Sequence, residues 1–440
     1  MERWSSRGVE SRRRDFVSAA TGGIALAAAL VICGRLGRRT ADSSAVTHPG
    51  HDDLSGSRIR RYPLEIRPGK ALGAEHQIPL ARLRRSLQRL QPSWEMFKIY
   101  KLAHAVELWG QSASFKVSPV RHADFHIPSY FKNSGEMVAV LLDARIHSRN
   151  SPHEDAVLFR SRHGVGVRTF PSRVGFEGAL LHDDTLLSTL AEAGVSTERV
   201  IYVDGRAATV RDLVTHAMAE VTTSQELEWT LNAFARYLLP HCYQWRSARF
   251  GSLLSLDRLT LALLRRPLGV GSCYGIHALY TLTIMDRLDR SFDILRGETR
   301  LAIRDRLLTA SDMIRLTQTS RGSWPAQWCK NVVIASDHRG MVSLHQPQFQ
   351  ELSATSHILE WLSVCGQDLR PAEAGIKRAC EFFLNELEAQ REEKIDFFYI
   401  QFTHGARGIS WLHGIHPADL IATSEQDLAS RNFSATLAFE

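Results

Sequence analysis

The spacing of apolar residues along the chain predicts a mainly helical protein. Four leucines recur at helical intervals in "IPLARLRRSLQRL", and a second helix is predicted in "SWEMFKIYKLAHAVELWG", between Ser93 as its N-cap and Gly110. From about residue 208 onwards this period dominates, and Thr222 and Gln225 have capping-box spacing ahead of "LEWTLNAFARYLLP". Further helices are predicted over residues 253–265, 275–290, 297–317, 354–365 and 371–388.

The region around residues 112–205 interrupts the helical period. "MVAVLLDARI" and "DAVLFRSRHGVGVRTF" carry β-branched runs, and His163-Gly164 is a candidate turn in the second of them. "RVIYVDGRAATVRDLV" predicts a strand, a turn at Asp204-Gly205 and a helix capped by Thr209. The expected fold class is therefore mainly α, with paired helices in the C-terminal half and a small β-containing insertion.

A basic and then apolar segment near the N-terminus predicts an export signal or a membrane anchor. Residues 16–33 contain no charged side chain and follow three consecutive arginines. Arg13, Arg14 and Phe16 resemble the twin-arginine export signal of bacteria. This resemblance implies a body outside the cytoplasm, either anchored by a single span in the bacterial cytoplasmic membrane or released into the periplasm after cleavage near Ser43-Ser44-Ala45. A buried core helix is the alternative for this segment.

Charge and cysteine content exclude some classes of function. Residues 1–61 carry eleven arginines against six acidic residues, which accounts for five of the seven net positive charges. The body is nearly neutral and has no basic stripe interleaved with aromatic residues, so no nucleic-acid partner is expected. The six cysteines include no C-x-x-C pair, which indicates neither a redox motif nor a zinc ribbon.

One short motif suggests an architecture. Gln318, Gly322 and Trp324 form a Q-x-x-x-G-x-W frame directly after a predicted helix. This frame resembles the repeat of the squalene-cyclase and prenyltransferase group, and the resemblance implies an α/α toroid in which Gln and Trp fix the end of one helix onto its neighbour. "QFTHGAR", residues 401–407, has the same frame with Arg407 in the place of Trp. Chance occurrence in a helical chain is the alternative.

These patterns together divide the chain. The predicted parts are a signal or anchor segment (1–39), a flexible linker (40–77), a mixed helical and β-containing part (78–206), a helical toroid-like domain (207–425) and a tail (426–440).

Cys273 and His277 are the candidate metal ligands. They lie four residues apart and hence on one face of a helix, a spacing that suits two ligands of one ion. Cys273-Tyr274-Gly275 is similar to the Cys-Tyr-Gly of lanthipeptide cyclases, whose Cys binds zinc, although their Cys-His-Gly motif does not occur here. Zinc would need a third ligand from another helix, for which Cys329, His338 and His357 are available. The alternative is a packed thiol and a core histidine.

His357 and Glu360 are the candidate catalytic pair. They share a helix face in "SATSHILEWL" and would serve as general acid and base, with Asp337 or His338 as further candidates. The alternative is that Glu360 faces solvent and that His357 caps a helix or packs in the core. Two other polar tracts carry no expected chemistry: His182-Asp183-Asp184 indicates a helix N-cap, and "HGARGISWLHGIH" indicates a solvated terminal loop.

Two classes of function fit these patterns. The first is a binding or scaffolding module held at the outer face of a bacterial membrane, with an unknown ligand or protein partner. The second is an enzyme with a site in the toroid cavity, terpenoid-cyclase-like, prenyltransferase-like or glycan-acting, with zinc as a candidate cofactor. Convergence of the candidate ligands would favour the enzyme, since the fold itself hosts both classes.

Overall fold

The computed structural model describes residues 58–94, 98–115, 131–150, 156–169, 180, 182–240, 244–330 and 347–423. All of them belong to the compact unit formed by residues 53–440. The helices are α1 (Leu80–Gln88), α2 (Ile99–Trp109), α3 (Ser134–Leu142), α4 (Ala144–Asn150), α5 (Thr185–Glu192), α6 (Val210–Glu220), α7 (Leu227–Tyr237), α8 (Leu256–Leu264), α9 (Ile276–Phe292), α10 (Gly297–Thr317), α11 (Pro347–Val364), α12 (Glu373–Ala389), α13 (Glu392–Phe397), α14 (Tyr399–Leu412) and α15 (Pro417–Ala422).

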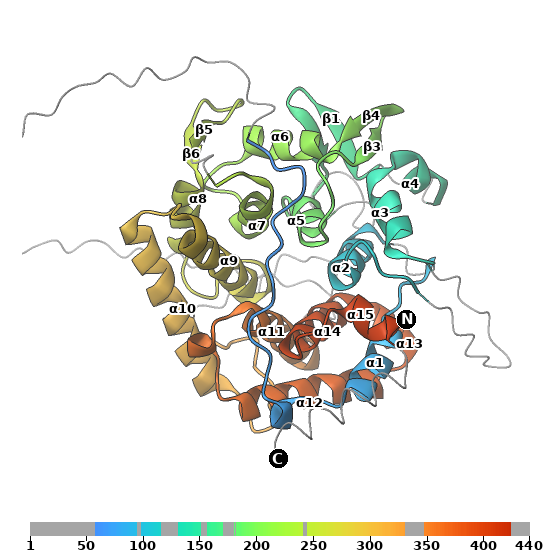
Figure 1. Cartoon of the computed structure of the whole chain (residues 1–440), viewed down its shortest axis with the longest axis vertical. Helices are drawn as coiled ribbons and strands as arrows, with labels where there is room; N and C mark the ends of the chain where they lie inside the picture. Colours follow the sequence, from blue (N-terminus) through green and yellow to red (C-terminus); the bar gives the residue numbers. More distant parts are fainter. Residues whose placement is uncertain are drawn as a thin grey trace, which may run out of the picture. The chain divides into compact units, whose positions relative to one another are not determined.

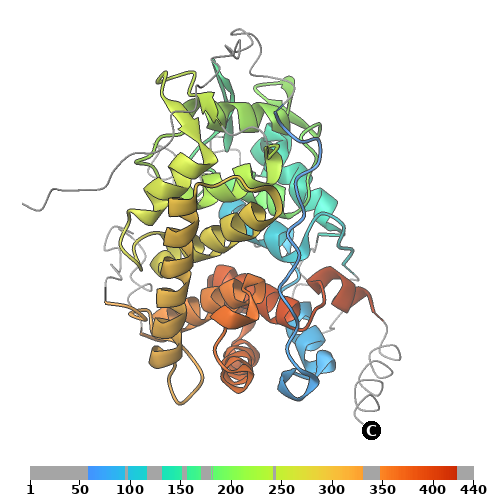
Figure 2. The same ribbon diagram turned by 60° about the vertical axis from the view of Figure 1, so that its left-hand side comes forward.

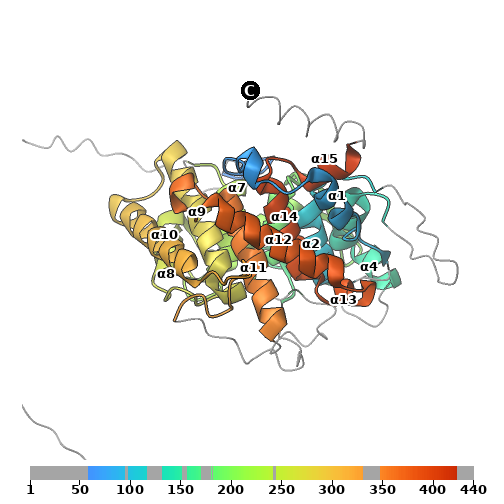
Figure 3. The same ribbon diagram turned by 90° about the horizontal axis from the view of Figure 1, so that it is seen from below.

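Six helices of this unit pack side by side in a closed ring. α2 contacts α5, α5 contacts α7, α7 contacts α9, α9 contacts α11, α11 contacts α14, and α14 returns to α2. Figure 1 looks down this ring, with α3, α6, α8, α10 and α12 outside it. In Figure 2, α10 runs along the outside beside α8 and α9, and Figure 3 shows α12 crossing α11 and α14.

The inner helices explain why the ring is stable. Almost every side chain of α2, α7 and α14 is buried, including polar ones, because each inner helix has neighbours on several sides. The mainly α fold class with small β insertions is confirmed. The ring also includes α2 and α5, so the paired helices are not confined to the C-terminal half of the chain.

Three two-stranded antiparallel hairpins accompany the helices in the described part of the chain. β1 (Leu158–Ser161) pairs with β2 (Gly164–Val167), β3 (Val200–Val203) with β4 (Arg206–Thr209), and β5 (Gln244–Arg246) with β6 (Leu253–Ser255). The Asp204-Gly205 turn lies between β3 and β4 as predicted. The β5–β6 hairpin lies beyond the predicted insertion, and it delays the start of α8 to Leu256. In Figure 1 the three hairpins are on the side of the ring where α6 lies.

Residues 58–77, called the strap here, run across one end of the ring mostly without regular secondary structure, apart from the 3-10 helix η1 (Ala74–His76) (Figure 1). The backbone N–H groups of Arg60, Gly69 and Leu72 donate to the carbonyl oxygens of Tyr237, Ser363 and Leu412, at 2.7, 2.7 and 2.8 Å. These carbonyls belong to the last turns of α7, α11 and α14, which have no partner within their own helices. Residues 58–77 therefore differ from the flexible linker predicted for residues 40–77, and the first part of that predicted linker, residues 40–57, lies outside the described residues.

The motif of Gln318, Gly322 and Trp324, called the helix-end motif here, joins α10, α11 and α12, and the backbone N–H of Trp324 donates to Thr355 Oγ1 of α11 at 2.9 Å. Gln318 Nε2 donates to the carbonyl oxygens of Gly322 and of Gly375 at the start of α12, both at 2.8 Å. Trp324 is fully buried, and its Nε1 donates to Ile314 O of α10 at 2.8 Å. The backbone at Gly322 has φ of 94°, and a Cβ there would meet Arg378 O at 2.5 Å. The packing role expected for Gln318 and Trp324 is thus the one that the structure has.

The prediction of a degenerate copy of this motif at residues 401–407 is wrong. These residues lie inside α14 and not at a helix end. The tract "HGARGISWLHGIH" is not a solvated loop either, because His404, Arg407 and His413 are buried. The apolar neighbours of these polar residues, together with an inner-ring position, make the segment a core helix.

Several helix starts also differ from the sequence analysis. Gln225 accepts a hydrogen bond from Thr222 N, as a capping box would require, but α7 begins only at Leu227. α12 begins at Glu373, after Pro371. α2 begins at Ile99, later than a helix capped by Ser93 would begin.

Candidate metal centre

Cys273 lies in a left-handed turn that leads into α9. The residues of η4 (Ser272–Gly275) include Cys273, Tyr274 and Gly275 with φ values of 49°, 62° and 75°. Positive φ at two successive non-glycine residues is strained and persists only where surrounding contacts fix it. Such backbone outliers occur preferentially at functional sites.

Buried contacts hold this turn in place. Glu228 of α7 accepts from the backbone N–H of Ser272 at 3.0 Å and from Arg266 Nη1 at 2.9 Å. Trp328 Nε1 donates to the carbonyl oxygen of Tyr274 at 3.1 Å. A Cβ at position 275 would meet the backbone of Gly269 at 2.7 Å, so only glycine fits there.

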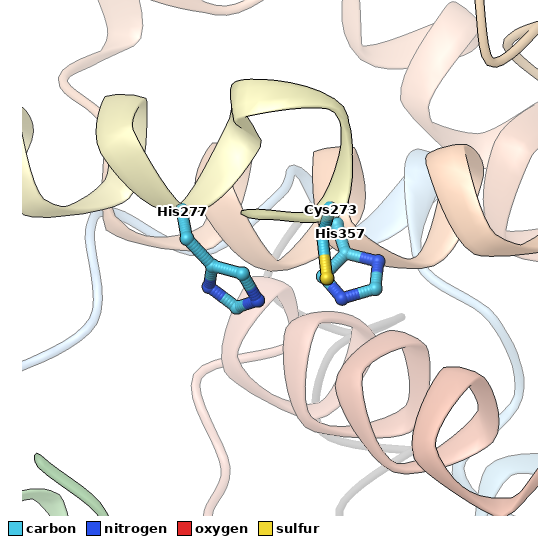
Figure 4. Close-up of side chains that lie close together, drawn as sticks. All are labelled: Cys273, His277 and His357. Atoms are coloured by element: carbon cyan, nitrogen blue, oxygen red, sulfur yellow. The ribbon is translucent and has the colours of Figure 1, made fainter. Parts of the chain in front are cut away.

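The turn brings Cys273 to two histidines. One donor atom each of Cys273, His277 and His357 lies within 4.8 Å of the others. His277 is in the first turn of α9, and His357 comes from the neighbouring inner helix α11 (Figure 4). These three residues are called the Cys273 cluster here. His277 and His357 are buried, whereas Cys273 is only partly shielded from solvent.

Both imidazoles present a nitrogen that has no hydrogen-bond partner. His357 Nδ1 lies 2.6 Å from Ser353 O, and since a carbonyl oxygen only accepts, the proton of the neutral ring is on Nδ1. His357 Nε2 then carries a free lone pair, and neither it nor His277 Nε2 has a partner among the described residues. Buried polar atoms are nearly always hydrogen-bonded, so two such nitrogens beside a thiol suggest a missing ligand.

The charge states of these groups suit a metal ion. Burial lowers the pKa of His357 to about 4 and that of His277 well below its ordinary value, so both rings are neutral at neutral pH. Partial burial and then the carboxylates of Glu226 and Glu360 raise the pKa of the Cys273 thiol. Neutral imidazole is the form that binds a metal, and a bound divalent cation would reverse the shift at the thiol by stabilising the thiolate.

Glu360 does not pair with His357, unlike the acid–base pair expected from the sequence. The carboxylate accepts instead from His404 Nδ1 at 2.8 Å and from Arg407 Nε at 2.6 Å, both on α14. The reason is geometric: His357 Nδ1 is already bonded within α11, and Glu360 faces the next inner helix. Burial raises the pKa of Glu360 to about 8, although Arg407 opposes the shift.

The other candidate residues are placed elsewhere or lie outside the described residues. Cys329 is buried and donates to Leu268 O at 3.4 Å, and it does not belong to the Cys273 cluster. Asp337 and His338 lie outside the described residues. Asp184 is at the N-cap position of α5, but its carboxylate accepts from Thr230 Oγ1 instead of capping the helix. His182 donates to Glu226 at 2.8 Å and stacks on Trp229, which in turn lies 4.2 Å from the His277 ring.

Sequence reasoning missed the polar residues of α2 and α14. His104 and Glu107, and likewise His404 and Arg407, are three residues apart within apolar helices, and all four are buried. Their rings and charges adjoin the Cys273 cluster, since the His404 ring centroid is 4.3 Å from that of His357. Polar pairs at helical spacing inside apolar helices were the signal that could have revealed them.

The predicted export signal of Arg13, Arg14 and Phe16 lies outside the described residues. Within the part of the chain that the structure describes, none of the helices combines the length and the apolar character that a membrane span requires. The chain matches no protein-family model, and neither a curated protein nor a solved structure matches it.

Proposed function

We propose that the chain is a metal-dependent enzyme whose site is the Cys273 cluster inside the helical ring. The observation that carries this proposal is the convergence of a thiol and two imidazoles, with buried nitrogens that have no other partner among the described residues. A purely binding or scaffolding module has no need for a strained turn that aims a cysteine at two histidines.

The donor set favours zinc. One thiolate and two imidazoles are borderline-soft ligands, which suit zinc better than magnesium or calcium. Three protein ligands also leave one position of a tetrahedral ion open, as in catalytic zinc sites, whereas structural sites have four.

An open position gives the site its chemistry. A zinc ion held by three protein ligands lowers the pKa of a bound water to about 7, so that hydroxide forms near neutral pH. An ion held by Cys273, His277 and His357 would thus supply an activated water for hydrolysis, in which the water oxygen would bond to a carbon or phosphorus atom, the bond to the leaving group would break and the leaving group would take up a proton. We therefore favour a hydrolytic reaction, and the substrate classes expected from the sequence, a lipid or a glycan, are those available at the outer face of a membrane.

Metal analysis of the purified full-length chain tests the proposal. We expect about one equivalent of zinc in this cluster, and replacement by cobalt should give the thiolate-to-cobalt absorption band of a Cys ligand. Cys273→Ala should abolish the band and His357→Ala should weaken metal binding. Cys380→Ala is the matched control, because Cys380 is buried on α12 outside the cluster and should change neither readout. Zinc content and cobalt spectra that do not change in the Cys273 and His357 variants would refute the site and favour the binding module.

The location remains a separate proposal. We propose that the body lies outside the cytoplasm, on the strength of the basic and apolar residues 12–33. A reporter that works only after export, fused to residues 1–61, would stay inactive if this is wrong. Changing Arg13 and Arg14 to Lys should lower export if the twin-arginine route is used.

A further inference from the structure

A second group of potential ligands lies inside the ring, beside the Cys273 cluster. It consists of His104 and Glu107 of α2 and His404 of α14, and is called the Glu107 cluster here. One donor atom of each residue lies within 4.8 Å of the others, and all three side chains are buried. α2 and α14 are neighbouring helices of the ring, so three ligands come from a rigid framework.

The free atoms of this cluster point to a missing partner. His404 Nε2 and Glu107 Oε2 have no hydrogen-bond partner among the described residues, although their side chains are more than nine-tenths buried. His104 Nδ1 lies 2.6 Å from Tyr100 O and therefore donates to it, which leaves a lone pair on Nε2.

The surroundings orient these ligands in the way metal sites require. His404 Nδ1 donates to the carboxylate of Glu360, and Thr189 Oγ1 donates to the other oxygen of Glu107 at 2.7 Å. A carboxylate or carbonyl behind a ligating histidine fixes its tautomer and raises its basicity. Both histidines of the cluster have such a partner.

Charge also favours a cation at this point. The buried charged groups here are the carboxylates of Glu107, Glu192 and Glu360 and the guanidinium groups of Arg236 and Arg407. Arg407 forms ion pairs with Glu192 and Glu360, and Arg236 lies 3.8 Å from Glu192. Once ionised, the three carboxylates outnumber the two guanidinium groups, and Glu107 is the one without an ion pair in the described structure.

We infer that the Glu107 cluster binds a second divalent transition-metal ion next to the first, so that the ring holds a two-metal centre. Two imidazoles and one carboxylate form a harder donor set than the Cys273 cluster and accept zinc, manganese or iron(II). Paired ions are common in hydrolytic enzymes, where one activates water and the other stabilises the leaving group. The inference extends the proposed function, but it rests on donors of its own.

The test is a metal titration of the full-length chain stripped of metal with a chelator. Zinc should bind at two equivalents in the wild type and at one in Glu107→Gln. Manganese, which thiolates bind poorly, should give one bound equivalent by electron paramagnetic resonance that Glu107→Gln removes. The cobalt–thiolate band should persist in Glu107→Gln and disappear in Cys273→Ala.

Two further variants keep the result interpretable. His104→Ala removes a second ligand and should repeat the loss, which guards against a folding defect specific to Glu107→Gln. Glu373→Gln is the matched control, since Glu373 belongs to a more exposed group with Glu75 and His76 that should contribute no tight site. A wild type with one zinc, lost in Cys273→Ala but kept in Glu107→Gln, would overturn the second site and leave the first intact. A wild type that binds neither zinc nor manganese would overturn both.

Discussion

The helix-end motif and the ring interior both bury polar side chains, but they use them differently. Around Gln318 and Trp324 the amide and indole N–H groups donate to carbonyl oxygens at 2.8 Å. In the interior, His277, His357, His404 and Glu107 each keep a buried atom with no partner in the described structure. A satisfied buried group stabilises the fold, whereas an unsatisfied one costs free energy and calls for an explanation such as an absent ion, water or ligand.

The largest effect on stability is expected at the helix-end motif. Trp324→Ala should lower the free energy of unfolding by about 3–5 kcal/mol, because it removes a fully buried indole and its hydrogen bond to Ile314. Denaturant unfolding measures this loss, and the metal content of the variant at low temperature should equal that of the wild type. A loss below about 1 kcal/mol would mean that the motif does not join these helices as described.

The second largest effect is a dependence of the free energy of unfolding on pH, which is expected from the ring interior and not from the helix-end motif. In the metal-free chain His357 has a pKa of about 4 against an ordinary value of 6.5, so the unfolded state takes up the proton first as the pH falls. This contribution to stability is complete above pH 6.5 and is lost progressively towards pH 4, with an upper limit of about 3 kcal/mol.

The measurement is the free energy of unfolding as a function of pH after chelation. His357→Gln should flatten the slope between pH 6.5 and 4, whereas Trp324→Ala should lower the whole curve without changing that slope, since the helix-end motif contains no titratable side chain. Equal slopes in wild type and His357→Gln would contradict the burial of a neutral imidazole.

The smallest expected effect is on metal affinity. Glu360→Gln replaces the carboxyl group behind His404 by an amide without removing a proposed ligand, so it should weaken binding at the Glu107 cluster roughly 10- to 100-fold. This corresponds to about 1.4–2.8 kcal/mol. Isothermal titration with zinc or manganese measures the change.

Glu388→Gln serves as its control, because Glu388 pairs with Arg82 at the protein surface and should leave the affinity unchanged. An affinity that stays the same in Glu360→Gln would show that Glu360 has only a structural role beside Arg407.

The sequence by itself determined the local features of this protein. The period of apolar residues predicted α9 and α10 within a few residues, because helix type and length follow from local spacing and from capping residues. The frame of Gln318, Gly322 and Trp324 indicated a helix-end contact, and the four-residue spacing of Cys273 and His277 indicated that they are neighbours. The shared helix face predicted for them is wrong, because Cys273 lies in the left-handed turn before α9. The ordered course of residues 58–77 was not predicted, since their hydrogen-bond partners are carbonyls far away in sequence.

Only the tertiary structure decided which polar residues meet. His357 joins Cys273 because α9 and α11 are neighbours in the ring, and Glu360 joins His404 and Arg407 because it faces α14. The His-rich tract that begins at His404 was predicted to be a solvated loop, but most of it belongs to α14, which lies in the ring. Helix spacing fixes which residues of one helix share a face, but ring closure brings the faces of separate helices together, and that depends on contacts between residues up to 300 positions apart, as between Glu107 and Arg407.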